Sequence, residues 1–231
     1  MTTAYTDVRD PVLATEGVYA PQQDSHLLIE TMDQTRLVPG HRVVDLCTGT
    51  GVVAIGAAVQ GAAEVTAFDI CPRAVRCARA NALAAGVEIA VHLGSWTRAM
   101  EFGPFDLVVC NPPYVPHGPG DDVDDIPAHV GPAWAWNAGH DGRLVLDPLC
   151  TAASDLLDDG GTMLVVQSEF SGIERSLEAL NDAELTAEVI AEQHIPFGPV
   201  LSARAKWLER VGRLRPGRRD EKLVVIRADK P

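Results

Sequence analysis

The stretch RVVDLCTGTGVVAIGAAVQ, residues 42–60, joins an apolar run to a helical pattern through two glycines. The first part, RVVDLC, is rich in β-branched residues and predicts a buried strand, whereas the Ala-rich second part predicts a helix. Gly49 and Gly51 allow the backbone between them to turn tightly and to approach a ligand closely. This order of strand, turn and helix is typical of a doubly wound α/β sheet, where ligands bind beyond the carboxyl ends of the strands.

Strand and helix patterns alternate along the rest of the chain, which predicts parallel strands with right-handed crossovers. We expect a single α/β domain over residues 1–231 with a doubly wound, seven-stranded, mostly parallel, Rossmann-like sheet. The last two strands lack a helix of the usual crossover type between them. We therefore expect the sixth strand to run parallel to the core and the last to enter antiparallel. The expected strands are 42–47, 64–69, 88–94, 105–110, 162–168, 185–195 and 222–229, and the expected helices are 52–60, 72–86, 142–161 and 172–183.

Composition and charge narrow the class of protein. The chain is 46% hydrophobic and 22% charged, as in ordinary globular proteins, and its net charge of −13 argues against nucleic acid as a general partner. No apolar run approaches the ~20 residues of a membrane span, and no signal sequence precedes the first pattern, so a cytoplasmic location is expected. Five scattered cysteines and the spacing of His117, His129 and His140 match no metal motif, so no metal is expected.

Asp69 ends the second expected strand, about twenty residues beyond the glycine turn, where a carboxylate can accept both hydroxyls of a ribose. The turn has Ala54 where the dinucleotide pattern G-x-G-x-x-G has its third glycine, a variant which that pattern permits. The glycine turn and Asp69 therefore indicate a nucleoside-containing cofactor and, taken alone, leave a nicotinamide cofactor open.

The tetrapeptide Asn-Pro-Pro-Tyr, residues 111–114, ends the fourth expected strand at the same edge of the sheet. Asn111 offers a side-chain carbonyl as an acceptor, and Pro112 has no N–H, so its surroundings present carbonyl groups. Tyr114 can cover the flat face of a π system. The group that fits is a neutral planar amine or amide, held so that its nitrogen points at an electrophile. The pattern therefore favours group transfer to a planar nitrogen.

The segments DLCTGTG, AFDI, GSW and NPPYV, in this order, resemble class I S-adenosylmethionine-dependent methyltransferases. More narrowly, they resemble the HemK-related enzymes, which methylate a glutamine amide in peptide-chain release factors. GVYAPQQDSHLLIE (17–30) and AWAWNAGHDGRLVLDPL (133–149) resemble the archaeal and eukaryotic branch of that group. The resemblance implies that residues 1–35 cover the cofactor and that residues 36–231 form the core. Within the core, 115–142 would be a substrate loop and 200–220 a basic insertion.

The resemblance also implies the roles of individual residues. Asn111, Pro112 and Tyr114 would be catalytic. The S-adenosylmethionine site would contain Ser25, Asp45, Cys47, Gly49, Gly51, Asp69, Ile70, Ser95, Trp96 and Asn111. Three positions depart from the family pattern: Cys47 replaces its first glycine, Ser95 replaces an aspartate that binds the adenine amine, and Cys71 replaces an asparagine or serine.

The acceptor is not fixed by these motifs, because N-P-P-Y also occurs in adenine-N6 methyltransferases. A protein glutamine is the leading interpretation, with adenine in nucleic acid, a small-molecule nitrogen and a catalytically silent scaffold as alternatives. Relatives of the branch work with a small zinc-binding activator subunit, so such a partner is a candidate. Seven cations within residues 204–219 predict a surface that helps to dock a macromolecular substrate, with a solvated helix as the close alternative.

Overall fold

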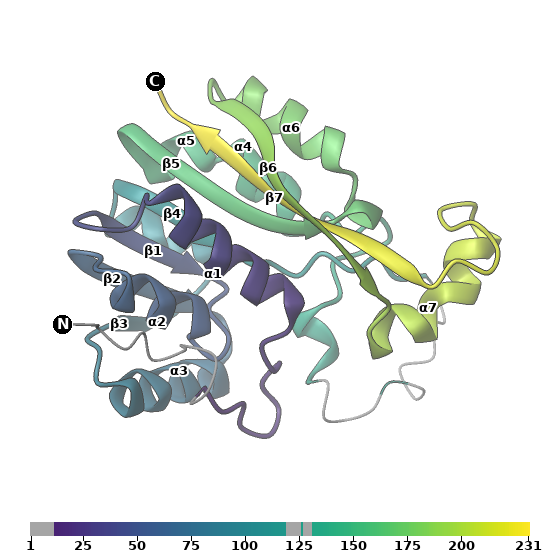
Figure 1. Cartoon of the computed structure of the whole chain (residues 1–231), viewed down its shortest axis with the longest axis horizontal. Coiled ribbons are helices and arrows are strands. Elements are labelled where there is room, and N and C mark those ends of the chain that lie inside the picture. The colour runs from purple at the N-terminus through teal and green to yellow at the C-terminus, as the bar shows by residue number, and fades with distance from the viewer. Residues whose placement is uncertain (1–11, 119–125, 127–130) are drawn as a thin grey trace.

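The computed structural model describes residues 12–118, 126 and 131–231, and its centre is a seven-stranded sheet (Figure 1). The strand order is β3-β2-β1-β4-β5-β7-β6. Strand β7 pairs antiparallel with both β5 and β6, so β6 runs parallel to the core strands. This arrangement confirms the predicted fold class, including the antiparallel last strand. The strands are β1 Arg42–Leu46, β2 Glu64–Asp69, β3 Ala90–Leu93, β4 Phe105–Cys110, β5 Leu157–Ser168, β6 Thr186–Pro196 and β7 Asp220–Asp229.

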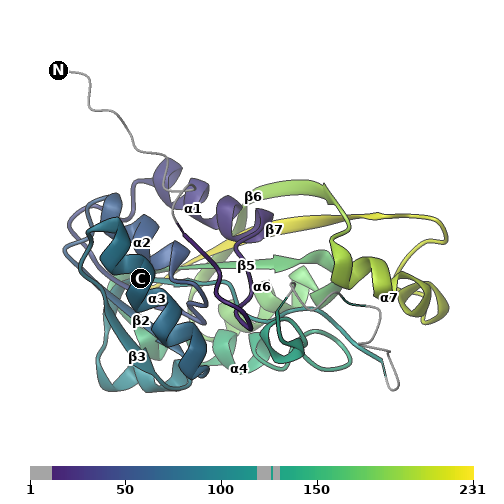
Figure 2. The same ribbon diagram turned by 90° about the horizontal axis from the view of Figure 1, so that it is seen from below.

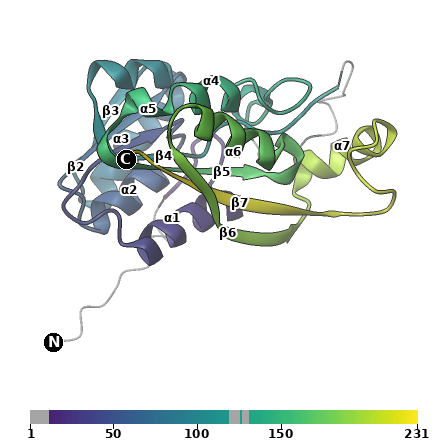
Figure 3. The same ribbon diagram turned by 90° about the horizontal axis from the view of Figure 1, so that it is seen from above.

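Helices cover both faces of the sheet (Figure 3). One face carries α1 (Gln23–Thr35), α2 (Val52–Val59) and α3 (Pro72–Ala85). The other carries α4 (Leu146–Thr151), α5 (Ala153–Leu156) and α6 (Ile173–Asp182). The central strands are therefore buried on both faces, which explains why they appear in the sequence as continuous apolar runs. None of the described helices is both long enough and apolar enough to cross a membrane.

The turn between β1 and α2 depends on its glycines. Gly51 caps α2 with a φ of 83°, and a Cβ at this position would lie 3.0 Å from the Cβ of Ala78 in α3. A larger residue would therefore be strained by its backbone and would also push α3 away. Helix α3 begins at Pro72 and is capped by Gly86 with a φ of 68°, as the sequence predicts.

The single helix predicted over residues 142–161 is wrong. The chain instead forms α4 and α5, which meet at Ala152, and β5 already begins at Leu157. Pro148 lies in the first turn of α4, where its missing N–H has no helical partner to lose. The register with β4 shifts between Leu157 and Thr162, and Gly160 has a φ of 77°, so the two glycines form an irregularity within β5 rather than a helix end.

Helices α1 and α7 (Pro199–Arg210) are findings of the structure, because the sequence pattern does not predict either. Helix α7 lies at the far end of the β6–β7 pair, away from the two helical layers (Figure 2). It begins at Pro199 and buries Val200, Leu201, Trp207 and Leu208 on one face. Its cations obscure this amphipathic pattern in the sequence. Because α7 does not cross back over the sheet, the last strand still returns antiparallel.

Candidate active site

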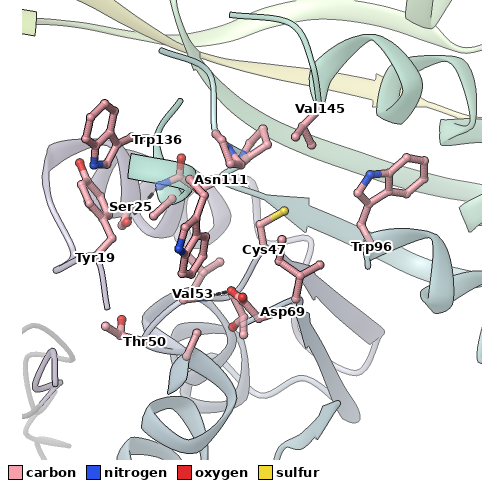
Figure 4. A pocket seen from close by; sticks show the side chains of 18 of the residues that line it. Tyr19, Ser25, Cys47, Thr50, Val53, Asp69, Trp96, Asn111, Trp136 and Val145 are labelled. Carbon is pink, nitrogen blue, oxygen red and sulfur yellow. Dashed lines mark hydrogen bonds between the residues drawn. The ribbon is translucent and has the colours of Figure 1, made fainter. Parts of the chain in front are cut away.

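A cavity of about 380 Å³ lies at the carboxyl ends of β1, β2 and β4 (Figure 4). It is within the size range of small-molecule sites. Every residue that the sequence motifs assign to the site lines this cavity, with the exception of Gly51. Gly51 instead packs against Ala78 of α3, on the side of the turn away from the cavity. The structure therefore brings together side chains from the N-terminal segment, the glycine turn, the end of β2 and the N-P-P-Y tetrapeptide.

Asp45 holds the glycine turn in shape. Its Oδ2 accepts hydrogen bonds from Thr48 Oγ1 at 2.5 Å and from the backbone N–H of Ala54 at 3.1 Å. Burial raises the pKa of Asp45 to about 7, although these two hydrogen bonds oppose the rise. The carboxyl group thus ties the end of β1 to the first turn of α2.

Asp69 stands beside the turn with both of its oxygens fixed. Its Oδ2 accepts from the backbone N–H of Gly49 at 2.9 Å and its Oδ1 from that of Cys71 at 2.8 Å. Burial raises the pKa of Asp69, and the two backbone hydrogen bonds oppose this rise. Each carboxylate oxygen can accept a further hydrogen bond, so a diol could bind across both. A Cβ added at Gly49 would meet no atom within 4 Å, so bare backbone faces open space next to this acid.

Cys47 occupies the position of the family's first glycine, and its backbone keeps a glycine-like conformation. Its φ is 61°, in the left-handed region that costs other residues roughly 1–2 kcal/mol. The turn thus places a side chain at a position whose backbone conformation favours glycine. The thiol side chain lies between Asp69 and Asn111 and fills part of the cavity (Figure 4).

The N-P-P-Y tetrapeptide is held by the first turn of α1. Asn111 Nδ2 donates to Ser25 Oγ at 3.2 Å, and the Tyr114 hydroxyl donates to Asp24 Oδ2 at 2.9 Å. Burial raises the pKa of Tyr114 well above its ordinary range, so its phenol remains a donor. Asp24 is a site residue that sequence reasoning missed. Its position directly before Ser25, in the segment that resembles the family, was the available signal.

The opposite end of the cavity is formed by Ile70, Ser95 and Trp96. Ile70 is 63% exposed, so its apolar side chain is open to a flat ligand. Ser95 caps the short 3₁₀ helix η1 (Trp96–Glu101), and its Oγ accepts from the backbone N–H of Thr97 at 3.4 Å. Figure 4 shows Trp96 well apart from Asn111, with Cys47 between them. The cavity thus has two ends of different chemistry, one with an exposed apolar side chain and one with polar, tightly hydrogen-bonded residues.

The loop after N-P-P-Y forms the outer wall of the polar end. The backbone N–H of Val115 donates to the carbonyl of Trp136 at 2.9 Å, which fixes that tryptophan beside the tetrapeptide. Arg204 of α7 donates to the carbonyl of Pro116 at 2.6 Å, and its guanidinium lies 5.0 Å from the centre of the Trp136 ring. Trp134 also lines the cavity but is 46% exposed. Trp136 therefore anchors the loop while Trp134 stands at the rim.

Most cations of the basic segment 204–219 have partners within the protein. Arg204 is buried, and Arg213 donates to the carbonyl of His140 at 2.9 Å. Arg218 pairs with Glu169 at 2.6 Å, and Arg219 pairs with Glu209 at 2.6 Å. The remaining cations, Lys206, Arg210 and Arg215, are exposed and make no ion pair with any of the described residues.

No cluster of three or more His, Cys, Asp or Glu side chains suited to a metal ion occurs among residues 12–118, 126 and 131–231. His129, one of the three histidines considered from the sequence, lies outside the described residues. Residues 1–11 of the predicted covering segment, and 119–125 and 127–130 of the predicted substrate loop, lie outside them as well.

The comparisons with known proteins agree with this geometry. The family model "Methyltransferase small domain" matches residues 11–124. A protein from Methanocaldococcus jannaschii, named "Putative protein N5-glutamine methyltransferase MJ0928", is 29% identical over 81% of this chain and 91% of its own length. The release factor glutamine methyltransferase of Mycolicibacterium smegmatis is 33% identical over 79% of this chain. The chain spans 65% of the length of that bacterial relative.

Among solved structures, the Mtq2–Trm112 complex of E. cuniculi is described as responsible for the methylation of the eRF1 translation termination factor. The matched chain superposes with a TM-score of 0.61, covering 93% of this chain and 99% of that one at 21% identity, and it supports the fold. The chain is thus similar in sequence and in fold to the class I methyltransferases. Within that class, the two relatives described above are named as glutamine methyltransferases, which confirms the resemblance seen in the sequence motifs.

Proposed function

We propose that this chain is an S-adenosylmethionine-dependent methyltransferase that acts on the side-chain amide nitrogen (N5) of a glutamine in a protein. The observation that carries the proposal is the orientation of Asn111. Its Nδ2 donates a hydrogen bond to Ser25 Oγ at 3.2 Å. Among the described residues, no donor contacts its Oδ1. That carbonyl oxygen is thus available as an acceptor on a residue that lines the cavity. An acceptor of this kind fits a substrate that presents an N–H.

The residues around the cavity fit the proposed cofactor. The two Asp69 oxygens suit a ribose diol, and the open backbone face at Gly49 leaves room for a ligand to approach closely. When bound, the cofactor supplies an electrophilic methyl group on a sulfonium sulfur. The exposed apolar side chain of Ile70 suits a flat adenine ring, and Ser95 can bind the adenine amine more weakly than an aspartate would.

On the acceptor side, the protein positions the nitrogen instead of activating it with a strong base. Asn111 Oδ1 and the carbonyl of Pro112 would accept the two N–H bonds of a carboxamide, with Tyr114 packed against its flat face. The amide nitrogen would then be directed at the methyl group, and positioning alone can account for much of a rate enhancement. The amide loses one N–H proton as it gains the methyl group.

The name of the Mycolicibacterium smegmatis relative supports a peptide-chain release factor as the protein substrate. The neighbouring Mtq2 structure contains Trm112, so we infer that a small activator subunit is a candidate partner of this chain. A release factor acts with the ribosome, and we accordingly place the enzyme in the cytoplasm. Adenine in nucleic acid is the acceptor that the experiment must exclude, because N-P-P-Y does not distinguish the two.

We further propose that residues 1–231 act as one methyltransferase domain, with 115–142 as the substrate loop and 200–220 as a basic insertion beside it. The contact of Arg204 with Pro116 supports this pairing, because it joins α7 to the loop at the polar end of the cavity. Lys206, Arg210 and Arg215 are the exposed cations of this region. They would attract a macromolecular substrate toward a protein that carries a net charge of −13.

The test is to incubate the protein with methyl-labelled S-adenosylmethionine and, in separate reactions, a purified release factor, total RNA and duplex DNA. The release factor should take the label, and Asn111→Ala should slow the transfer by about 10²–10³-fold. A release factor that carries alanine in place of its acceptor glutamine should remain unlabelled. Label in RNA or DNA, with none in the release factor, would refute the proposed acceptor.

A further inference from the structure

Asp24 is a buried carboxylate whose two oxygens both contact groups of the acceptor side. It is 5% exposed and lies in the first turn of α1. Its Oδ2 accepts from the Tyr114 hydroxyl at 2.9 Å. Its Oδ1 accepts from the backbone N–H of Ser25 at 2.7 Å and, through a longer contact of 3.4 Å, from the Ser25 hydroxyl. One carboxylate thus reaches Tyr114 directly and Asn111 through Ser25.

The direction of these hydrogen bonds follows from the chemistry of the groups. A hydroxyl group has one proton to donate, and an ionised carboxylate can only accept. Because Ser25 gives its proton to Asp24, its oxygen can only accept from Asn111. Asn111 must then direct its Nδ2 toward Ser25, as the structure has it, and its Oδ1 is left for the cavity.

We propose that Asp24 is a positioning residue that, through Ser25, sets which way the carboxamide of Asn111 faces. This inference rests only on the part of the proposed function in which Asn111 orients a planar nitrogen, and it holds for a glutamine or an adenine acceptor. Without the acceptor at position 24, the Ser25 hydroxyl becomes able to donate to Asn111 Oδ1. The carboxamide of Asn111 would then rotate and present its NH₂ group to the NH₂ group of the substrate. Two facing donors cannot bond each other.

The groups that surround Asp24 favour this role. Tyr19, Tyr114 and Glu221 face it from the segment before α1, from the end of β4 and from β7. Burial raises the pKa of both tyrosines, so each phenol stays protonated. Burial also raises the pKa of Glu221 to about 7. No Lys or Arg among the described residues forms an ion pair with Asp24. The groups that donate to its oxygens are the Tyr114 hydroxyl and the backbone N–H and hydroxyl of Ser25.

The experiment is a double-mutant cycle on kcat, measured at saturating cofactor with whichever acceptor the parent methylates. Asp24→Leu should lower kcat about ten- to hundredfold, because the amide is held in the wrong orientation. Asp24→Asn, which can keep its carbonyl oxygen toward Ser25, should retain most of the activity. The double variant Asp24→Leu/Ser25→Ala should recover part of the loss, because no hydroxyl remains to hold the wrong orientation. A purely structural role predicts that the double variant is at least as impaired as Asp24→Leu.

Two controls keep the test decisive. Asp33→Leu makes the same substitution at an exposed position of the same helix and should leave kcat unchanged. The dissociation constant of S-adenosylhomocysteine, measured by calorimetry, reports whether each variant folds and keeps the cofactor end intact. If Asp24→Leu does not fold, Ser25→Ala tests the proposal by itself. This variant should lower kcat by about three- to tenfold. Ser25→Thr, which keeps the hydroxyl, should have the kcat of the parent.

Either a double variant no better than Asp24→Leu or an unchanged kcat in Ser25→Ala would overturn the role of Asp24. Neither result would contradict the proposed function, provided that the parent protein methylates glutamine. If the parent protein methylates adenine instead, the proposed acceptor is refuted. The double-mutant cycle can still be measured with adenine as the acceptor.

Discussion

The two ends of the cavity are built in different ways. The proposed cofactor end, which contains the glycine turn and Asp69, relies mainly on local contacts. Thr48 and Ala54 donate to Asp45, and Gly49 and Cys71 donate to Asp69. The proposed acceptor end, which contains N-P-P-Y and Ser25, relies on contacts between distant segments. Ser25 meets Asn111 across 86 positions, and Arg204 meets Pro116 across 88. The first end is therefore shaped mainly by local turn chemistry and the second by the packing of α1 and α7 onto the sheet.

This difference implies that the two ends can be damaged separately. Substitutions at the glycine turn should weaken cofactor binding and leave positioning of the acceptor intact. Substitutions around N-P-P-Y should slow methyl transfer and leave cofactor binding intact. The largest effect is expected at the proposed acceptor end, where Asn111 alone is proposed to orient the nitrogen.

Asn111→Ala should lower turnover by about 10²–10³-fold, as expected when one precisely placed polar group is lost from a reacting centre. S-Adenosylhomocysteine should bind with nearly unchanged affinity, because Asp69 and the glycine turn do not depend on Asn111. Calorimetry and methyl-transfer kinetics on the same preparation check both statements. A variant that loses cofactor affinity and turnover in equal measure would show that the two ends are not separable.

The sequence could predict which residues lie together at the proposed cofactor end, because that end is built mainly from local patterns. A strand, a glycine turn and an acid at the end of the next strand are adjacent patterns, and together they are enough to place Asp69 beside Gly49. Asp24 could not be found this way. Its role depends on α1 packing against Tyr114, which lies 90 positions away.

Two errors in the predicted fold have similar causes. The helical pattern of residues 142–161 concealed the start of β5, because pairing with β4 overrides local propensity at Leu157. The charges of residues 204–219 concealed helix α7, whose buried face includes Arg204 itself. In both cases long-range contacts decide the local structure.

Asp69→Ala should weaken S-adenosylhomocysteine binding about ten- to hundredfold, which corresponds to the ~1.5–3 kcal/mol of hydrogen bonds to a charged group. At saturating cofactor, the turnover of this variant should fall much less than that of Asn111→Ala. Calorimetric titration gives the affinity, and Asp158→Ala, at an exposed position, is the matched control. If a folded variant binds S-adenosylhomocysteine with an unchanged dissociation constant, Asp69 does not contribute to cofactor binding.

Glu221→Gln should stabilise the protein at high pH. Burial raises the pKa of Glu221 to about 7, with Ser168 opposing and Asp24 adding to the rise. Between about pH 4.5 and 7 the unfolded chain releases this proton while the native protein keeps it, so the parent loses stability as pH rises through that range. The variant should exceed the parent by about 3 kcal/mol in free energy of unfolding at pH 8.

The advantage of Glu221→Gln should disappear near pH 4, where the acid is protonated in both states. Denaturant unfolding at the two pH values provides the measurement. Equal gains at both pH values would point to a packing effect in place of the buried charge.

The triple variant Lys206→Ser, Arg210→Ser and Arg215→Ser should have the smallest effect. At low salt, kcat/KM for the macromolecular acceptor should fall about two- to fivefold, and the difference should vanish at high salt, because such steering acts over ~8 Å at physiological ionic strength. Arg218 and Arg219 are left unchanged because they pair with Glu169 and Glu209. Identical salt curves for parent and variant would assign these cations to a solvated surface without a docking role.

The most direct test of the account is to locate the transferred methyl group. After reaction with S-adenosylmethionine and a release factor, tandem mass spectrometry of the digested substrate should find one added methyl group on the side-chain nitrogen of a single glutamine. The product should form far more slowly with Asn111→Ala, and its amount should be reduced with Asp69→Ala at limiting cofactor. A methyl group on a lysine, on an arginine or on a nucleobase, with every glutamine unmodified, would contradict the account.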